Sequence, residues 1–373
     1  MPDRPEIQLP AELLPIDGRF GSGPSKVRLE SLLELGVSGS TYMGTSHRQD
    51  RVKKVVHRIR AGLSELYNLP AGFEVLLGVG GATAFWDAAA FGLIERRSQH
   101  LVFGEFSAKF ASVVAGAPHL DEPELIESDP GTHPHPAARQ DVDVYAFTHN
   151  ETSTGVMMPI ARPEGADGLV VVDATSAAGA AHADVDQFDV YYFSPQKAFG
   201  SDGGLWIALC SPFAVSRIER LASSERWIPP FLDLRTALDN SRKDQTYNTP
   251  ALATLFLLDR QIAVMHELGG LDWAVKRSKT SSETVYAWAD ASVYAAPFVT
   301  DPAMRSSTVV TVDLVPEVSA DVVEGVLRDN GILDTFGYRK LGRNQLRIAC
   351  FPNVDPTDVE KLTRAVDHIV ERL

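Results

Sequence analysis

Cysteine is scarce in this chain: its 373 residues include two, Cys210 and Cys350, and both lie in apolar runs. Two cysteines cannot build a disulfide framework or a metal site made of cysteine alone, so we expect two buried free thiols. Long apolar runs are also missing, since no segment approaches the ~18 uncharged residues that a membrane helix needs. The amino terminus lacks the basic and apolar regions of a secretory signal. We therefore expect a cytoplasmic protein that does not enter a membrane.

Positive charge is in deficit: 35 lysines and arginines stand against 49 aspartates and glutamates, a formal net charge of −14. This balance argues against a general affinity for nucleic acid or anionic membranes, although a local basic pocket is compatible with it. A metal signal is weak as well, because His133 and His135 lie close together in DPGTHPHPAA without a third ligand nearby. We expect no metal, and any anionic substrate must meet clustered arginines.

Alternating helix and strand patterns run from about residue 50 to 265 and predict the main fold. Short apolar strands are expected in FEVLLGV, HLVFGEF, VDVYAFTHN, GLVVVDAT, DVYYFSPQ and GGLWIALC, several of them separated by helical stretches. Strands that are apolar throughout are usually covered on both faces. We therefore expect an α/β domain with a mostly parallel, doubly wound sheet over residues 17–268.

The pattern changes after this region. Helices are expected in LDWAVKRSKTSSETVYAWAD, ADVVEGVLRDN and PTDVEKLTRAVDHIVERL, and strands in STVVTVDLV, GILDT and NQLRIACF. This order predicts a smaller α+β domain over residues 269–373, which we expect to include the N-terminal segment 1–16.

Two charged residues follow buried strands at the edge where an open parallel sheet binds its ligands. Asp173 follows four apolar residues, and Lys197 follows the strand YYFS. A structural ion pair is one explanation of two such charges. The other is that both address one cofactor, the lysine forming an imine with an aldehyde and the carboxylate keeping a pyridine nitrogen protonated. That description fits pyridoxal 5′-phosphate.

A phosphate site is indicated by GVGGATA, where small residues lead from a strand into a helix. Backbone N–H groups at such a turn lie at the positive end of the helix dipole and bind phosphate. The spacing is not that of a dinucleotide fold, and the next strand ends at Phe106 rather than at an acidic residue. An aromatic ring at Phe106 can instead stack on a planar ring.

Six motifs together resemble the class V aminotransferases of fold type I: GGAT, NETSTG, VVVDATS, SPQKAF, YNTP and GTSHR. The similarity extends from GRFGSGPSKV to LRIACFP, and the chain is most similar to an actinobacterial form. The resemblance implies that Lys197 bonds the cofactor, Asp173 meets its pyridine nitrogen, Phe106 stacks on its ring and Thr152 meets its phenolic oxygen. It also implies a homodimer with shared sites, in which the cofactor phosphate is held by Ala82, Thr83, Thr175 or Ser176, Gln196 and the neighbouring subunit's Asn248 and Thr249.

The implied reaction is amino transfer between L-glutamate and 3-phosphohydroxypyruvate in serine biosynthesis, and a longer phosphorylated keto acid of vitamin B6 synthesis stays open. Each substrate carries two anionic groups, which suits arginine because its planar fork pairs bidentately with them. Arg347 is expected at the α-carboxylate, and His47 and Arg48 at the second anionic group. In GYRKLGR, Arg339 matches best, whereas Tyr338, Lys340 and Arg343 are equally compatible with a solvated loop.

Other functions fit the same residues less well. A cysteine desulfurase needs a thiol on a mobile loop, and both cysteines lie within expected strands. Another class V aminotransferase, such as a serine–glyoxylate type, would share the cofactor residues but has no reason for GTSHR and GYRKLGR. A non-catalytic protein of the same fold would need neither Lys197 nor Asp173.

Overall fold

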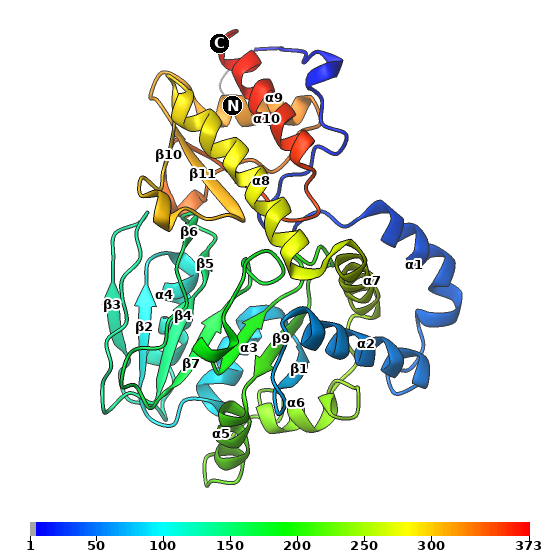
Figure 1. Cartoon of the computed structure of the whole chain (residues 1–373), viewed down its shortest axis with the longest axis vertical. Helices are drawn as coiled ribbons and strands as arrows, with labels where there is room; N and C mark the ends of the chain where they lie inside the picture. The colour runs from blue at the N-terminus through cyan, green and yellow to red at the C-terminus, as the bar shows by residue number, and fades with distance from the viewer. Residues whose placement is uncertain (1–4) are drawn as a thin grey trace.

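The computed structural model describes residues 5–373 and contains one large and one small sheet, stacked along the long axis of the molecule (Figure 1). The large sheet has seven strands in the order β1-β9-β8-β7-β4-β2-β3. These strands are β1 (Glu74–Val79), β2 (Ser98–Val102), β3 (Glu124–Glu127), β4 (Val144–Thr148), β7 (Leu169–Asp173), β8 (Val190–Phe193) and β9 (Leu205–Cys210). Neighbours pair in parallel except where β9 runs against β8 and β1. The expected mostly parallel sheet is confirmed.

Helices cover both faces of this sheet, as expected for a doubly wound fold. On β1, Val75 and Leu77 pack into one apolar core while Leu76 packs into the other, because successive side chains of a strand point to opposite faces. The first face is covered by α2 (Asp50–Leu66) and α7 (Leu252–Leu268). The second face is covered by α3 (Gly81–Gly92), α4 (Glu105–Ala115), α5 (Pro212–Ala222) and α6 (Leu234–Ser241).

The reversal of β9 brings two distant turns together. After β8 the chain passes Lys197 and returns as β9, which lies between β8 and β1. The backbone N–H of Gly80, just after β1, then donates to the carbonyl oxygen of Gly204, just before β9, at 2.9 Å. The carboxyl ends of β1, β2, β4, β7 and β8 share one edge of the sheet, which is the edge where ligands are expected.

Strand β3 is an element that the sequence reading missed. It has four residues, pairs only with β2, and alternates half-buried and exposed positions, so it lacks the continuous apolar run that marks the other strands. The hairpin of β5 (Asn150–Glu151) and β6 (Val156–Met157) was missed for its shortness.

The small sheet is antiparallel and has the order β10-β11-β12, formed by β10 (Ala295–Pro297), β11 (Val309–Leu314) and β12 (Gln345–Ala349). It packs with α8 (Gly270–Ala291), α9 (Ala320–Asp329) and α10 (Pro356–Val370) around an apolar core that includes Leu9 and Phe20 of the N-terminal segment. The strand expected in GILDT was wrong: Leu333 makes only an isolated parallel bridge to Arg19. Asp334 has a φ of 65°, which interrupts an extended run there.

The domain limits 17–268 and 269–373, the latter with segment 1–16, stay a prediction, and residues 1–4 lie outside the part of the chain that the structure describes. Helix α1 (Leu29–Tyr42) projects at one side of the molecule and exposes Leu29, Leu33 and Val37 (Figure 1). Within residues 5–373, no helix combines the length and apolar character needed to cross a lipid bilayer.

Candidate active site

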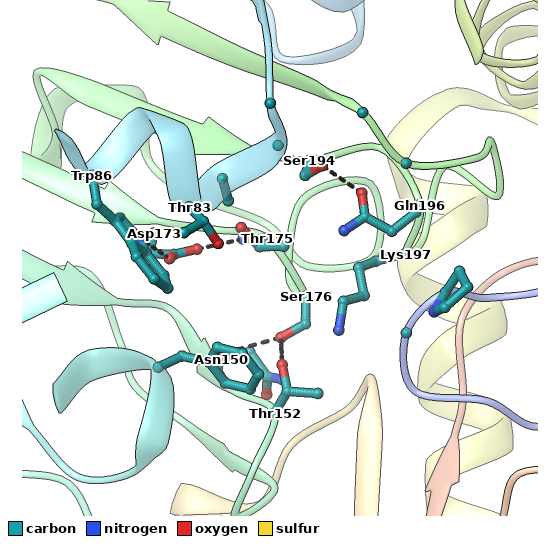
Figure 2. A pocket seen from close by; sticks show the side chains of 18 of the residues that line it. Thr83, Trp86, Asn150, Thr152, Asp173, Thr175, Ser176, Ser194, Gln196 and Lys197 are labelled. Atoms are coloured by element: carbon teal, nitrogen blue, oxygen red, sulfur yellow. Dashed lines mark hydrogen bonds between the residues drawn. The ribbon is translucent and has the colours of Figure 1, made fainter. Parts of the chain in front are cut away.

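A cavity of about 530 Å³ opens at the carboxyl edge of the large sheet, a size typical of small-ligand sites (Figure 2). It is bordered by the ends of β1, β4, β7 and β8, by the start of α3, and by a piece of the N-terminal segment. The lining includes Gly23, Pro24, Gly80, Gly81, Ala82, Thr83, Trp86, Phe106, Asn150, Thr152, Asp173, Thr175, Ser176, Ser194, Gln196 and Lys197. The structure therefore brings together every cofactor residue expected from the sequence except Asn248 and Thr249.

Lys197 points into the middle of this cavity (Figure 2). Its Nζ donates a hydrogen bond of 2.6 Å to the carbonyl oxygen of Ser22, and it forms no ion pair with Asp173 or with any other carboxylate of the described chain. Burial, assisted by the positive charge of Arg347, lowers the pKa of Lys197 to about 8. A structural ion pair between Lys197 and Asp173 is therefore the wrong explanation, and a reactive amine fits better.

Asp173 is the last residue of β7 and is buried. Its two carboxylate oxygens have separate donors: the indole Nε1 of Trp86 at 3.2 Å and the backbone N–H of Thr175 at 2.9 Å. Two neutral donors fix the direction of the carboxylate without neutralising its charge. The sequence reading missed Trp86, because one aromatic residue in an apolar helix gives no sign that its N–H faces a strand end.

The start of α3 forms one end of the cavity. Gly80 adopts a φ of 105°, and no side chain caps the helix, so the N–H groups of its first turn have no side-chain partner. A Cβ atom at Gly80 would come within 2.6 Å of Ala84 Cβ, and the close turn therefore requires glycine. Such a helix start attracts a phosphate group.

Thr175 and Ser176 are the two candidates for binding the cofactor phosphate, and their hydroxyl groups differ in their hydrogen bonds. The buried Oγ1 of Thr175 has no hydrogen-bond partner among the described residues. The Ser176 hydroxyl is engaged instead, since it accepts from Asn150 Nδ2 and Thr152 Oγ1, both at 2.8 Å (Figure 2). Thr175 is thus the residue with a free group for an anion.

Ser194 is a further lining residue that the sequence did not single out. Its hydroxyl lies against Gln196 Oε1 and against the carbonyl oxygen of Leu205, 2.6 Å away. It ties the orientation of the Gln196 amide to the reversal into β9. A serine within the strand end YYFS gives no such signal, because Leu205 is eleven residues away.

Phe106 lies in the first turn of α4 and forms a wall of the cavity. Lys197 Nζ lies 5.9 Å from the centre of its ring, and the ring of Tyr338, from the small-sheet region, is 6.1 Å away. The expected ring-stacking position is therefore next to the lysine, and the Tyr338 ring lies close to it.

Arg347 of β12 lies beside the cavity without an ion-pair partner in the described part of the chain. Its Nη1 donates to the carbonyl oxygen of Thr152 at 3.2 Å, and its Nε is buried without a hydrogen bond. Burial lowers the pKa of this guanidinium. A mostly buried, unpaired arginine is costly for the fold, so the arrangement favours an anionic ligand here.

The basic loop GYRKLGR lies between α9 and β12, and its cations have different partners. Lys340 forms an ion pair with Glu105, and Arg343 donates through Nε and Nη2 to the carboxylate of Asp313. Arg339 has no carboxylate partner within residues 5–373; it packs over Phe336, 5.5 Å from the ring centre, and lines a neighbouring cavity rather than the one at Lys197. Of the three cations, Arg339 is the one available to an anion.

Besides Arg347 and Arg339, four more expected site residues do not line the cavity of their own chain: His47, Arg48, Asn248 and Thr249. They gather elsewhere, since Thr249 Oγ1 lies 3.2 Å from His47 Nδ1, and Arg48 Nη1 donates to Gln245 Oε1 at 3.0 Å. Asn248 and Thr249 are exposed. The two segments form one group at the surface, in which Arg48, Asn248 and Thr249 are exposed and His47 is buried.

The chain is similar to known proteins of one family. The family model for class-V aminotransferases matches residues 129–339. A phosphoserine aminotransferase from Nocardioides sp. (strain ATCC BAA-499 / JS614) is 57% identical over 370 residues, covering 98% of this chain and 99% of the relative.

Solved structures share the fold. A phosphoserine aminotransferase from Cytophaga hutchinsonii superposes with a TM-score of 0.87 at 24% identity, covering 95% of this chain and 99% of its own. A phosphoserine aminotransferase with bound PLP from Trichomonas vaginalis gives 0.78 at 18% identity, covering 94% and 99%. At 24% and 18% sequence identity, these two similarities show a shared fold and nothing further.

The chain therefore belongs to the class-V aminotransferase family. Its full-length identity places it, within that family, among the phosphoserine aminotransferases.

Proposed function

We propose that this chain transfers an amino group reversibly between L-glutamate and 3-phosphohydroxypyruvate, giving O-phospho-L-serine and 2-oxoglutarate in serine biosynthesis. Pyridoxal 5′-phosphate is the cofactor. The observation that carries the proposal is the unpaired, buried Lys197, whose pKa is lowered to about 8, in one cavity with the doubly held carboxylate of Asp173. The full-length identity to phosphoserine aminotransferases supports the choice of substrates.

The residues present fit the cofactor at each of its groups. The uncapped start of α3 and the free Oγ1 of Thr175 suit a phosphate, with Ala82, Thr83 and Gln196 beside them. Asp173 suits a protonated pyridine nitrogen, Phe106 the ring face and Thr152 the phenolic oxygen. Gly23 leaves the space that the lysine needs, because a Cβ atom there would lie 2.3 Å from Lys197 Nζ.

The cofactor, when bound, would supply an aldehyde that takes up the amino group and a ring that accepts the electron pair left on the α-carbon when its proton is removed. Lys197 supplies the amine. With its pKa at about 8, a useful fraction of Nζ is neutral at physiological pH and can accept and return the α-proton. Asp173 keeps its negative charge directed at the ring nitrogen because Trp86 and Thr175 hold both of its oxygens. We infer these roles from position, partners and burial.

Substrate anchoring follows from the unpaired cations. Arg347 is placed for the α-carboxylate that glutamate and the keto acid share, since its buried Nε lacks a partner. Arg339 is available to a second anionic group. The phosphate of the keto acid and the γ-carboxylate of glutamate both suit His47 and Arg48. We assign these two residues to the site of the neighbouring subunit.

A homodimer with shared sites is part of the proposal. His47, Arg48, Asn248 and Thr249 stand together, away from their own chain's cavity, and the apolar side chains of α1 nearby in sequence are exposed. Both features are compatible with a dimer in which these four residues of one chain contact the cavity of a second copy. The cytoplasmic location expected from the sequence remains a prediction.

The test is an assay of purified protein with glutamate and either 3-phosphohydroxypyruvate or plain hydroxypyruvate, with 2-oxoglutarate as the measured product. We expect a strong preference for the phosphorylated acceptor, no turnover by Lys197→Ala, and a reduced preference in Arg48→Ala. The longer phosphorylated keto acid of vitamin B6 synthesis is run as a third acceptor. Equal rates with both hydroxypyruvates would remove the phosphorylated substrate and leave only an aminotransferase.

A further inference from the structure

Glu151 is a fully buried carboxylate that the proposed mechanism does not use. It lies in the short strand β5, between two residues that line the cavity, Asn150 and Thr152. No lysine, arginine or histidine within residues 5–373 forms an ion pair with it. Burial alone raises the pKa of this carboxyl, so an ionised form needs strong hydrogen-bond donors.

Five donors surround the carboxylate and come from two separate segments. Oε2 accepts from the backbone N–H groups of Phe106 at 3.1 Å and Ser107 at 3.0 Å, and from the Ser107 hydroxyl at 3.0 Å. Oε1 accepts from the backbone N–H of Ser153 at 3.1 Å and from its hydroxyl at 2.7 Å. One carboxylate therefore ties the start of α4 to the turn after β5.

The first of these segments carries the ring that borders the cavity. A negative charge at a helix start is stabilised by the helix dipole and by N–H groups that have no partner within the helix. Here the bonded N–H groups belong to Phe106 and its neighbour, so Glu151 fixes the backbone from which the Phe106 ring extends. The contact is close: a Cβ atom at Gly104 would lie 2.3 Å from Glu151 Cγ, which excludes any other residue before the helix.

The second segment carries polar groups of the cavity. Thr152 Oγ1 is bonded to Ser176, and the carbonyl oxygen of Thr152 accepts from Arg347. Burial lowers the pKa of both Lys197 and Arg347, and the charge of Glu151 partly opposes that lowering at each of them. The hydrogen bonds of Glu151 and Ser153 hold the backbone on both sides of Thr152. They therefore affect the position of the Phe106 ring, of the Thr152 hydroxyl and of Arg347.

We propose that Glu151 is a positioning residue that holds Phe106 against one face of the cofactor ring and Thr152 at its edge, through one buried carboxylate shared by two segments. The inference rests on the proposed cofactor. It assigns to the middle residue of the Asn-Glu-Thr motif a role that is separate from its neighbours.

The experiment compares Glu151→Gln with wild type as holoenzymes. Glutamine keeps the shape but turns an NH₂ group toward two or more of the five donors. We expect roughly tenfold weaker binding of pyridoxal 5′-phosphate and a reduced circular dichroism of its visible band, which reports how rigidly the ring is held. Ser153→Ala removes one donor and should shift both readouts in the same direction by less, and it serves as the decisive variant if Glu151→Gln does not fold.

Asp143→Asn is the matched control. The Asp143 carboxylate also caps backbone N–H groups, those of Glu95, Arg96 and Arg97 at 2.7 to 2.9 Å, but it precedes β4 at the opposite edge of the same sheet. It should lower the melting temperature and leave cofactor affinity and the visible dichroism at their wild-type values.

The outcomes separate the two ideas. Suppose that wild type binds the cofactor and that Glu151→Gln and Ser153→Ala have the same affinity and dichroism as wild type. This result would overturn the positioning role and leave the proposed function intact. Equal losses in Asp143→Asn would do the same, because they would show a general effect of stability. Failure of wild type to bind pyridoxal 5′-phosphate would remove the proposed function and this role with it.

Discussion

The Nζ atom of Lys197 lies 2.6 Å from the carbonyl oxygen of Ser22, a residue 175 positions earlier in the chain. The next residue, Gly23, has a φ of 153°, and a Cβ atom on it would lie 2.3 Å from that same Nζ. The N-terminal segment thus forms the wall behind the amine. The reach of the lysine into the cavity depends on the absence of a side chain at Gly23.

Gly23→Ala is expected to displace Lys197 and to lower kcat by about a hundredfold, the loss that a shift of about 1 Å in a reacting group produces. Steady-state kinetics and the visible spectrum of the bound cofactor measure the effect. Gly116→Ala is the control: Gly116 has a φ of −79°, and an added Cβ would meet only ordinary contacts. Wild-type kcat in Gly23→Ala would contradict the steric argument.

The lowered pKa of Lys197 predicts a pH dependence for the reaction of apo-protein with pyridoxal 5′-phosphate. Only the neutral amine attacks an aldehyde, so the rate should fall about tenfold for each pH unit below the pKa of about 8 and level off above it. Stopped-flow absorbance across pH 6 to 10, a window set about this pKa, measures the profile.

Arg347→Met provides an internal check on that profile. Arg347 repels the protonated lysine and so lowers its pKa. Without the guanidinium, protonated Lys197 is more stable, and the midpoint should move to higher pH. A midpoint near the ordinary lysine pKa in wild type would show that burial does not act on this amine.

Arg347 and Arg343 should differ sharply in their effect on substrate. Arg347→Met removes the proposed α-carboxylate anchor, and kcat/KM should fall roughly 10- to 150-fold for both glutamate and the phosphorylated keto acid. Arg343→Gln breaks an exposed ion pair with Asp313 and should change kcat/KM less than about threefold. Loss for one substrate alone would contradict a shared anchor.

Trp86→Phe removes one of the two donors to Asp173 and keeps an aromatic ring. We expect kcat to fall about tenfold, because the carboxylate that meets the cofactor ring is less well directed. Trp288→Phe is the matched control, since its Nε1 donates to Asp367 at 2.8 Å, far from the cavity in the small-sheet region. Equal kcat values in the two variants would show that the Trp86 bond serves stability alone.

Mixing of inactive subunits tests the shared site. In a heterodimer of Lys197→Ala and Asn248→Ala chains, one site lacks both groups and the other has both. Activity should therefore recover when subunits exchange. A mixture that stays inactive, although tagged chains prove the exchange, would place Asn248 outside the partner's site.

Strand ends were predictable from the sequence because the signal is local. Four apolar residues before Asp173 and an aromatic strand before Lys197 define where each strand stops, and the topology then brings both to one edge. The mostly parallel sheet follows from the same apolar runs. β3 and the failed strand in GILDT show the limit, because short polar pairings depend on neighbours rather than on their own pattern.

The remaining site details depend on partners that are distant in sequence. Lys340 and Arg343 cannot be distinguished from Arg339 in GYRKLGR, since their carboxylates, Glu105 and Asp313, lie 235 and 30 residues away. The same holds for Trp86, whose N–H meets Asp173 across 87 residues. A residue's type and local pattern do not reveal such pairings.

The hydrogen bond from Gly80 N–H to the carbonyl oxygen of Gly204 gives the site a rigidity that precedes any ligand. It joins the turn proposed for the phosphate to the loop that follows Lys197, so the fold itself holds the two points proposed to bind the cofactor at a set separation. Binding then orders little of the chain, and the entropy lost on association stays small. Because β9 is inserted between β8 and β1, the spacing of the two turns is set by the width of one strand.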